Sequence, residues 1–213
     1  MTVRRTPDDR NRFRALSEAG ARNAATALSQ MIGRPLRLEV RWSRMVKLPK
    51  VAWLAGGPTR PVCALSLRVY GEARGNLLLV LDHEQVPVLL DLLVKERAAA
   101  PPAGPIGLTA LEESALLEVG NIVAAAYLNA LSGLLGASLL PSIPSLAIDM
   151  AGAVTDFLLI ELVPVSETTL VLASELREPD SGLRCGIFFL PDPAALTVLE
   201  RAAGAARHPT TAA

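Results

Sequence analysis

Three polar side chains in a mostly apolar segment have the types and the spacing to act together. Ser114, Glu118 and Asn121 stand at positions i, i+4 and i+7 of segment 108–144. At ~100° per residue of an α-helix they fall within an arc of about 60°. A carboxylate and a carboxamide one turn apart can therefore reach a single partner group. Ala125 and Ser132 continue the stripe with small side chains that would let a partner come close. A polar stripe is also typical of an ordinary solvated helix face, and the pattern alone favours that interpretation.

The segment that carries these residues has the signals of one long helix. Thr109 is a suitable N-cap, and Glu112 three residues later completes a capping box. Gly136 and Pro141 are typical of the end of a helix. The residues that recur at helical spacing and are expected to face a core are Leu116, Val119, Ile122, Val123, Ala126, Tyr127, Ala130, Leu131 and Leu134.

The three polar residues belong to a longer pattern that ends at Pro144. The pattern is Asp or Ser, three residues, Glu, two residues, Asn, twenty-two residues, Pro, and it is met without a gap. In this signature and in the surrounding text (ALLEVGN, AAAYLNALS, PSIPSLAIDMAGAV), the chain resembles the CheC/CheX/FliY phosphatases of bacterial chemotaxis. The resemblance extends over most of the chain, from about residue 16 to about residue 199.

The resemblance implies an enzyme that removes phosphate from an aspartyl phosphate on a CheY-type receiver domain. Because that bond is a reactive mixed anhydride, positioning a water in line can account for the acceleration. Asn121 suits this role, since its carboxamide accepts from the water without competing as a nucleophile. Glu118 is expected to hold a cation of the receiver, most simply a lysine, with general-base catalysis as the less favoured alternative. Ser114 is expected near the interface, and Pro144 is expected to shape the strand entry beside the site.

The partners and cofactors follow from the same resemblance. We expect no metal and no cofactor held by this chain, with Mg²⁺ supplied by the phosphorylated receiver. A CheD-type receptor deamidase is a second partner that the resemblance implies. The chain carries 21 Lys and Arg against 21 Asp and Glu, which argues against nucleic acid or an anionic membrane as the main partner.

Composition also limits the compartment. The first twelve residues, MTVRRTPDDRNR, lack the apolar core of a secretory signal, and no run reaches the ~18 apolar residues of a membrane helix. Cys63 and Cys185 lie in apolar, strand-like runs without metal-ligand spacing. We expect them to be buried free thiols in the cytoplasm.

Helices and strands are expected along the rest of the chain. Thr6 and Pro7 give a good start for a helix that runs to about Met31. The basic segment 44–50 is expected to be a solvated surface loop, with a binding loop as the alternative. The other expected elements are strands at 36–42, 62–70, 76–82, 145–150, 157–163, 169–174 and 185–190, a short helix at 86–94 and a last helix at 192–203.

Two parts of the sequence are similar to each other. Residues 27–33 (ALSQMIG) match residues 130–136 (ALSGLLG) without gaps, and 78–90 matches 187–199 more weakly. Duplication predicts a pseudo-two-fold α/β (α+β) body, and the resemblance implies two long helices on a shared, mainly antiparallel sheet. The expected organisation is a single domain at 6–205 with repeats at 6–97 and 108–203, a linker at 98–107, and tails at 1–5 and 206–213, the last of them disordered.

The first repeat is expected to lack the polar pair. In the repeat register Glu118 corresponds to Ala15, and Asn121 corresponds to Glu18. A three-residue gap would put Glu18 in the glutamate position, but Ala21 then takes the asparagine position. Since family members often carry the pair in both halves, we hypothesise that the first site of this chain is catalytically silent.

Two other functions compete with the phosphatase. The chain could be a non-catalytic adaptor that binds a CheD-type deamidase or a receiver domain, or a flagellar switch component related to FliY and FliM. Retention of Glu118 and Asn121 favours the enzyme, because FliM-like middle domains lack this pair. CheX-like chains are shorter, carry a single copy of the motif and dimerise. Two repeats in one chain therefore favour a CheC-like monomer.

Overall fold

The computed structural model describes residues 13–94, 107–160 and 166–205. The expected helix start at Thr6, the tails and most of the linker lie outside these ranges. The described elements, in chain order, are α2 (Arg14–Ile32), β1 (Arg37–Lys47), the 3-10 helix η1 (Leu48–Ala55), β2 (Pro61–Gly71), β3 (Gly75–Asp82), η2 (His83–Gln85), α3 (Val86–Leu93), α4 (Ala110–Leu135), β4 (Leu139–Pro141), β5 (Ser145–Met150), α5 (Ala151–Leu159), β6 (Thr168–Arg177), β7 (Arg184–Pro191), η3 (Pro193–Ala195) and α6 (Leu196–Ala205).

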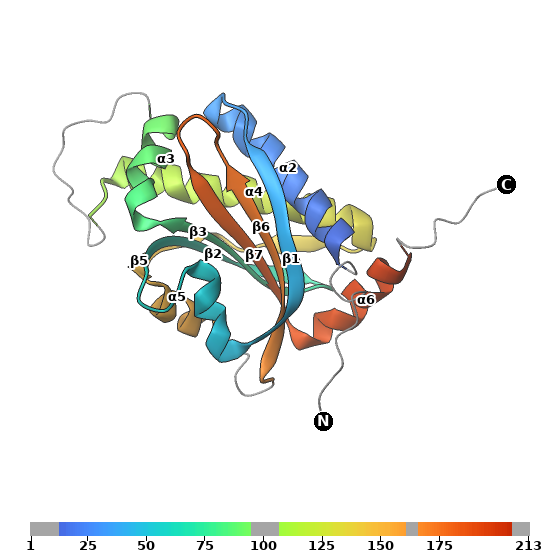
Figure 1. Cartoon of the computed structure of the whole chain (residues 1–213). Helices are drawn as coiled ribbons and strands as arrows, with labels where there is room; N and C mark the ends of the chain where they lie inside the picture. Colours follow the sequence, from blue (N-terminus) through green and yellow to red (C-terminus); the bar gives the residue numbers. More distant parts are fainter. Residues whose placement is uncertain (1–12, 95–106, 161–165, 206–213) are drawn as a thin grey trace.

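The strands of the described residues form one sheet. Its order is β1-β6-β7-β3-β2-β4, with β5 also paired to β2, and all of these pairs are antiparallel. Helices α2 and α4 pack side by side on one face, whereas η1 and α5 cover the opposite face (Figure 1). The predicted α+β fold, with two long helices on a shared antiparallel sheet, is confirmed.

The larger core lies between the sheet and the two long helices. Tyr127 of α4 is fully buried there, and its ring centroid lies 6.4 Å from that of Phe189 on β7. The same ring lies against Gly20 of α2, where an added Cβ would be only 3.0 Å from it. Glycine on the core face of α2 therefore makes room for the aromatic ring, which allows the two long helices to pack closely.

The sheet order shows the internal duplication directly. Strands β1, β2 and β3 of the first repeat correspond to β4 with β5, β6 and β7 of the second, and reversing the order exchanges the two repeats. The repeats meet at the pairing of β3 with β7, where Leu78 opposes Phe188 and Leu79 opposes Ile187. The pseudo-two-fold axis therefore passes between β3 and β7, and the sheet is continuous across both halves. The residue boundaries predicted for the repeats and the linker remain predictions.

Matching hydrogen bonds follow the two long helices. Ser29 Oγ accepts from the Leu36 amide at 2.9 Å, and Ser132 Oγ accepts from the Leu139 amide at 3.1 Å. Both helices end at a left-handed glycine, with φ +70° in the first repeat and +62° in the second. The matching sequence ALS…G therefore forms the same turn in both repeats, and this turn leads the chain from the end of the helix into the next strand.

Two sequence predictions on this side of the sheet are wrong. The expected strand at 157–163 is helical as far as it is described, because α5 covers Ala151–Leu159. Ala151, Val154, Thr155 and Leu159 of that helix are buried, a spacing of three and four residues that fits a helix lying on the sheet. The run Phe-Leu-Leu-Ile has high strand propensity, but packing of the preceding residues decides its conformation.

The basic segment 44–50 is not a loop. It contains the end of β1, where Met45 pairs with Leu170, and the beginning of η1. Val46 and Leu48 are buried in the core under η1, which anchors the segment although its two lysines and its arginine are exposed. The three-residue strand β4 was also not predicted.

Helix α4 is long and apolar enough to span a membrane by length and composition, and 44% of its most apolar window is buried. Its apolar residues pack against α2 and the sheet, as expected of a core helix in a globular domain. This burial, rather than the absence of an apolar segment, is the argument against a membrane span.

Candidate functional site

The ends of α4 are fixed as the sequence predicts. Thr109 Oγ1 accepts from the Glu112 amide at 3.3 Å, and Glu112 Oε2 accepts from the Thr109 amide at 2.9 Å, which together form a capping box. At the other end Gly136 is left-handed, and its amide donates to the Ser132 carbonyl. These caps set the rotation of α4 and hence the direction in which each side chain points.

One stripe of α4 faces solvent. Ser114, Glu118, Asn121 and Ala125 are all exposed. The opposite stripe is buried among α2 and the sheet, and its buried members are Leu116, Val119, Gly120, Val123, Ala124, Tyr127, Leu128 and Leu131. The structure therefore brings the four predicted site residues of the helix onto one accessible face.

Glu118 and Asn121 are neighbours on that face. Asn121 Nδ2 lies 3.5 Å from Glu118 Oε2, a long and weak hydrogen bond in which the amide donates. The contact turns the nitrogen of the carboxamide toward the carboxylate. Asn121 Oδ1 is then left as an acceptor facing away from Glu118, available to a water or a partner group.

Pro144 lies beside the pair, although it is 23 positions beyond Asn121 in the chain. A Cβ built on Gly120 would lie 3.2 Å from Pro144 Cβ and 3.7 Å from Leu65 Cβ of β2. The absence of a side chain at Gly120 therefore allows the segment between β4 and β5 to pack on α4, next to Asn121. Close packing, not access to a ligand, explains this glycine.

The segment that carries Pro144 is held in place by β2. Arg68 N donates to Ser142 Oγ at 2.9 Å, and Ser142 N donates to the Arg68 carbonyl at 2.8 Å. Ser142 Oγ also lies 2.8 Å from the Ile143 carbonyl, to which it donates. Ser142 and Ile143 were not singled out from the sequence. The position of Ser142 directly after an unpredicted strand left no local signal for these bonds.

The α4 stripe carries a single carboxylate, that of Glu118. Within residues 13–94, 107–160 and 166–205, no three His, Cys, Asp or Glu side chains gather in a way that could hold an ion. The other polar groups of the stripe are the carboxamide of Asn121 and the hydroxyl of Ser114, whereas a Mg²⁺ site uses carboxylates or phosphates with ordered waters. No cation of the described residues forms an ion pair with Glu118, so its charge is free to meet a partner's cation.

The equivalent face of the first repeat is different. An open groove of about 710 Å³ lies between α2 and β1, lined by Arg14, Glu18 and Arg22 among others. Arg14 Nε lies 2.6 Å from Glu18 Oε1, so the carboxylate at the register of Asn121 is already paired within its own helix. Ala21, three residues after Glu18, is fully buried. No asparagine accompanies the glutamate at the motif spacing.

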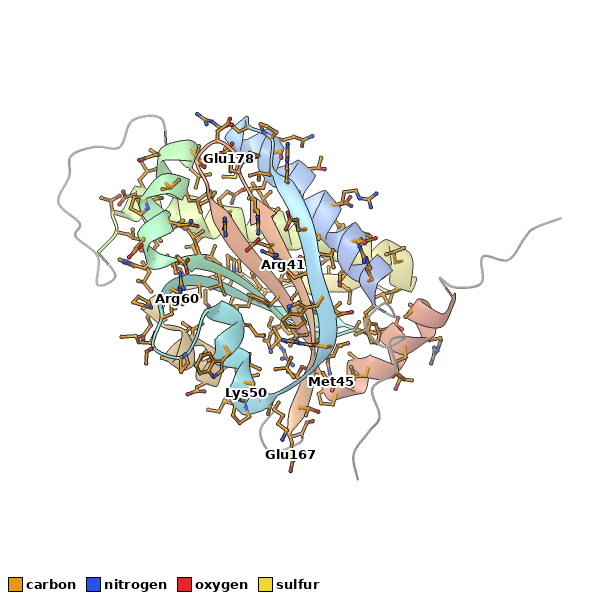
Figure 2. All side chains as sticks on the ribbon, viewed as in Figure 1. Arg41, Met45, Lys50, Arg60, Glu167 and Glu178 are labelled. Carbon is orange, nitrogen blue, oxygen red and sulfur yellow. The ribbon has the colours of Figure 1, made fainter. Side chains whose placement is uncertain are left out.

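The first repeat also lacks an equivalent of Pro144. Arg41 occupies that register on the edge strand β1 (Figure 2), and its guanidinium lies 2.5 Å from Glu175 of β6. A β-bulge interrupts the pairing of β1 with β6 at this residue. The helices and strands are thus duplicated, but within residues 13–94 of the first repeat there is no counterpart of the polar pair or of the contact between Pro144 and the helix.

Comparisons with known proteins agree with the motif. No protein-family model matches the chain. It is 29% identical over 184 residues to the CheY-P phosphatase CheC of Bacillus subtilis, a match that covers 84% of this chain and 86% of the relative. In fold it is similar to FliY of Thermotoga maritima, with a TM-score of 0.67, 18% identity, and coverage of 95% of this chain and 98% of the other.

A second solved structure contains a bound receiver. It is a CheX–CheY–BeF₃–Mg²⁺ complex from Borrelia burgdorferi, with a TM-score of 0.55, 14% identity, and coverage of 82% of this chain and 96% of the other. At these identities the two solved structures show a similarity of fold alone. The match to CheC shows a similarity of sequence as well. The chain is thus similar in sequence to CheC, and similar in fold to FliY and CheX, three chemotaxis proteins of the CheC/CheX/FliY family.

Proposed function

We propose that this chain is a chemotaxis phosphatase that hydrolyses the aspartyl phosphate of a CheY-type receiver domain. The observation that carries the proposal is the exposed Glu118–Asn121 pair on α4, flanked by Pro144. The similarity to a CheY-P phosphatase supports the reaction, and the CheX–CheY complex supports a receiver as the partner.

In the proposed reaction a water oxygen attacks the phosphorus atom while the bond from phosphorus to the aspartyl oxygen breaks. The products are the free carboxylate and inorganic phosphate, which keeps the oxygen and the protons of the water. Asn121 Oδ1 accepts a hydrogen bond from the attacking water and aligns it with the leaving oxygen. The contact between Nδ2 and Glu118 supports this role, since it orients the amide with Oδ1 outward.

Glu118 docks the receiver in this mechanism. Its carboxylate lacks a cation among the described residues and is exposed, so it can pair with a lysine near the phosphorylated aspartate. A general base is not required, because the carboxylate of an acyl phosphate is a good leaving group. Ser114, one turn earlier, would contact the rim of the receiver, and the methyl side chain of Ala125 would let its surface approach.

The Mg²⁺ ion in this proposal belongs to the receiver. It would neutralise charge on the phosphoryl oxygens, whereas this chain contributes the water-orienting amide and the docking carboxylate. We also propose a monomer, because the contact between repeats is already made inside one chain by β3 and β7. A cytoplasmic location fits the free thiols of Cys63 and Cys185.

The alternative is an adaptor that binds a receiver or a CheD-type deamidase without catalysis. The observation that favours it is the first repeat, where Glu18 is paired with Arg14 and no asparagine follows at the motif spacing. The first repeat thus presents a helix face that can bind a partner but has no asparagine at the motif spacing to orient a water. A flagellar switch role is the third candidate, supported by the similarity to FliY.

The test is loss of phosphate from a phosphorylated, Mg²⁺-bound CheY-type receiver. Wild-type chain is expected to accelerate the loss, and Asn121→Ala to abolish most of the acceleration. Asn129→Ala is the matched control, because Asn129 is an exposed asparagine two turns further along the same helix. If wild type binds the receiver without accelerating phosphate loss, the adaptor function replaces the enzyme.

A further inference from the structure

Two large apolar side chains are exposed on either side of the Glu118–Asn121 pair. Ile143 is 86% exposed, the highest value among the large apolar residues of the described chain, and Leu111 is 60% exposed. Single exposed apolar residues are common and need no explanation by themselves. The position and the fixed backbone of these two residues set them apart.

Ile143 is held out in solvent by its neighbours. Ser142 is tied to Arg68 of β2 by two hydrogen bonds, of 2.9 and 2.8 Å, and donates to the Ile143 carbonyl. On the other side Pro144 packs on Gly120 of α4. With both flanking residues anchored, the backbone of Ile143 is held between β2 and α4, and its side chain is exposed one residue before the contact of Pro144 with Gly120.

Leu111 is presented at the other end of the same face. It precedes Glu118 by seven residues, which corresponds to nearly the same direction from the helix axis and a rise of about 10 Å. The capping box of Thr109 and Glu112 fixes the first turn of α4 and therefore the place of Leu111. The resulting surface consists of Leu111, the Glu118–Asn121 pair and Ile143, with the polar pair between the two apolar residues.

We propose that Leu111 and Ile143 are the docking contacts of the receiver, placing its phosphorylated pocket opposite Asn121. This inference rests on the proposed function and extends it to the residues that set receiver affinity. The fitting partner has a polar, phosphorylated pocket bordered on both sides by apolar surface. Burying two apolar side chains around a polar centre also excludes water from the Glu118 contact, which strengthens it.

The chain offers a matched control for Ile143. Leu140 is 63% exposed and lies only three residues earlier. Its neighbour Leu139 is buried in the core beneath α4, and successive residues of a strand point to opposite faces. Leu140 therefore lies on the face of the sheet away from the α4 stripe, next to Tyr70 of β2.

The experiment measures affinity and turnover in parallel. Binding to a receiver activated with beryllofluoride and Mg²⁺ gives the dissociation constant, and steady-state phosphate release gives KM and kcat. Ile143→Ser and Leu111→Ser are each expected to raise the dissociation constant and KM by about tenfold, with kcat within about twofold of wild type. Leu140→Ser is expected to leave all three values unchanged, and Ile143→Leu to recover most of the affinity.

The outcomes separate this inference from the proposed function. If wild type hydrolyses the phosphate but Ile143→Ser and Leu140→Ser bind equally well, the docking surface is wrong and the phosphatase stands. If wild type binds without hydrolysis and the serine variants weaken binding, the docking surface stands and the phosphatase fails. A wild-type chain that self-associates through this face, shown by sedimentation and lost in Ile143→Ser, would assign the surface to a second copy and overturn the inference.

Discussion

Pro144 packs on Gly120, the residue directly before Asn121. An added Cβ at Gly120 would lie 3.2 Å from Pro144 Cβ, so the glycine and the proline are complementary in shape. This contact joins the segment between β4 and β5 to the exposed face of α4. It explains in physical terms why a proline far along the chain belongs to the same signature as the polar pair.

Gly120→Ala should therefore destabilise the protein, although alanine favours helices. The added methyl meets a proline ring that cannot turn away, and we expect a loss of about 1 kcal/mol or more. Gly133→Ala is the control on the same helix, since an added Cβ there meets nothing within 4 Å. That variant should gain about 0.5–1 kcal/mol. Thermal unfolding of both variants gives the sign of each change, and equal shifts would argue against the Gly120–Pro144 contact.

Ser29 and Ser132, which lie in the last turns of the two long helices, should contribute equally to the stability of the protein. Ser29→Ala and Ser132→Ala each remove one hydroxyl acceptor from a strand amide, at Leu36 and Leu139 respectively. We expect each variant to lose about 1 kcal/mol in urea unfolding. Since Ser29 lies on α2 and Ser132 lies eleven residues beyond Asn121 on α4, phosphatase activity at low temperature should remain near the wild-type value. Losses differing by several-fold would contradict the structural equivalence of the two repeats.

The two glutamates at the motif positions should behave differently. Glu118→Ala removes an exposed carboxylate that has no cation partner among the described residues, and should lower kcat/KM for the receiver by at least tenfold. Glu18→Ala removes a carboxylate already paired with Arg14 in the same helix, and dephosphorylation should change by less than twofold. Comparable losses in the two variants would show that the first repeat is not silent.

The cysteines should be unreactive in the folded protein. Burial, complete at Cys63 and only partial at Cys185, where full burial was expected, raises the pKa of both thiols to about 12 from an ordinary value of 9.0. Thiol reagents at pH 8 should therefore label them far more slowly in buffer than in urea. Because the folded-state pKa values are raised, the thiols contribute stability that is present below pH 9 and is lost as the pH rises toward 12. Rapid labelling of the native chain at pH 8 would be inconsistent with this burial.

The sequence predicts the central helix well because its signals are local. The capping box, the left-handed glycine and the apolar spacing of α4 all follow from neighbouring residues, and the ALS repeat marks equivalent turns. The strand expected at 157–163 is wrong because propensity outweighed the helical spacing of Ala151 and Val154. Local patterns do not determine which side of the sheet such a segment covers.

The geometry around the polar pair depends on contacts between distant residues. Ile143 is an isoleucine between a serine and a proline, and such a residue is more often buried than exposed. Its exposure follows from the bonds of Ser142 to Arg68 and the packing of Pro144 on Gly120. No local pattern predicts either contact, so the flanks of the site become visible only in the folded chain.

The central claim is that Asn121 acts in the chemical step and not in docking. The most direct measurement is single-turnover phosphate loss from a Mg²⁺-bound phospho-receiver at saturating chain, combined with the affinity for the beryllofluoride-activated receiver. Asn121→Ala is expected to slow phosphate loss roughly a hundredfold while its affinity stays within about threefold of wild type. An Asn121→Ala variant that retains the wild-type rate at saturation would contradict the account, because α4 would then be a docking surface without a role in catalysis.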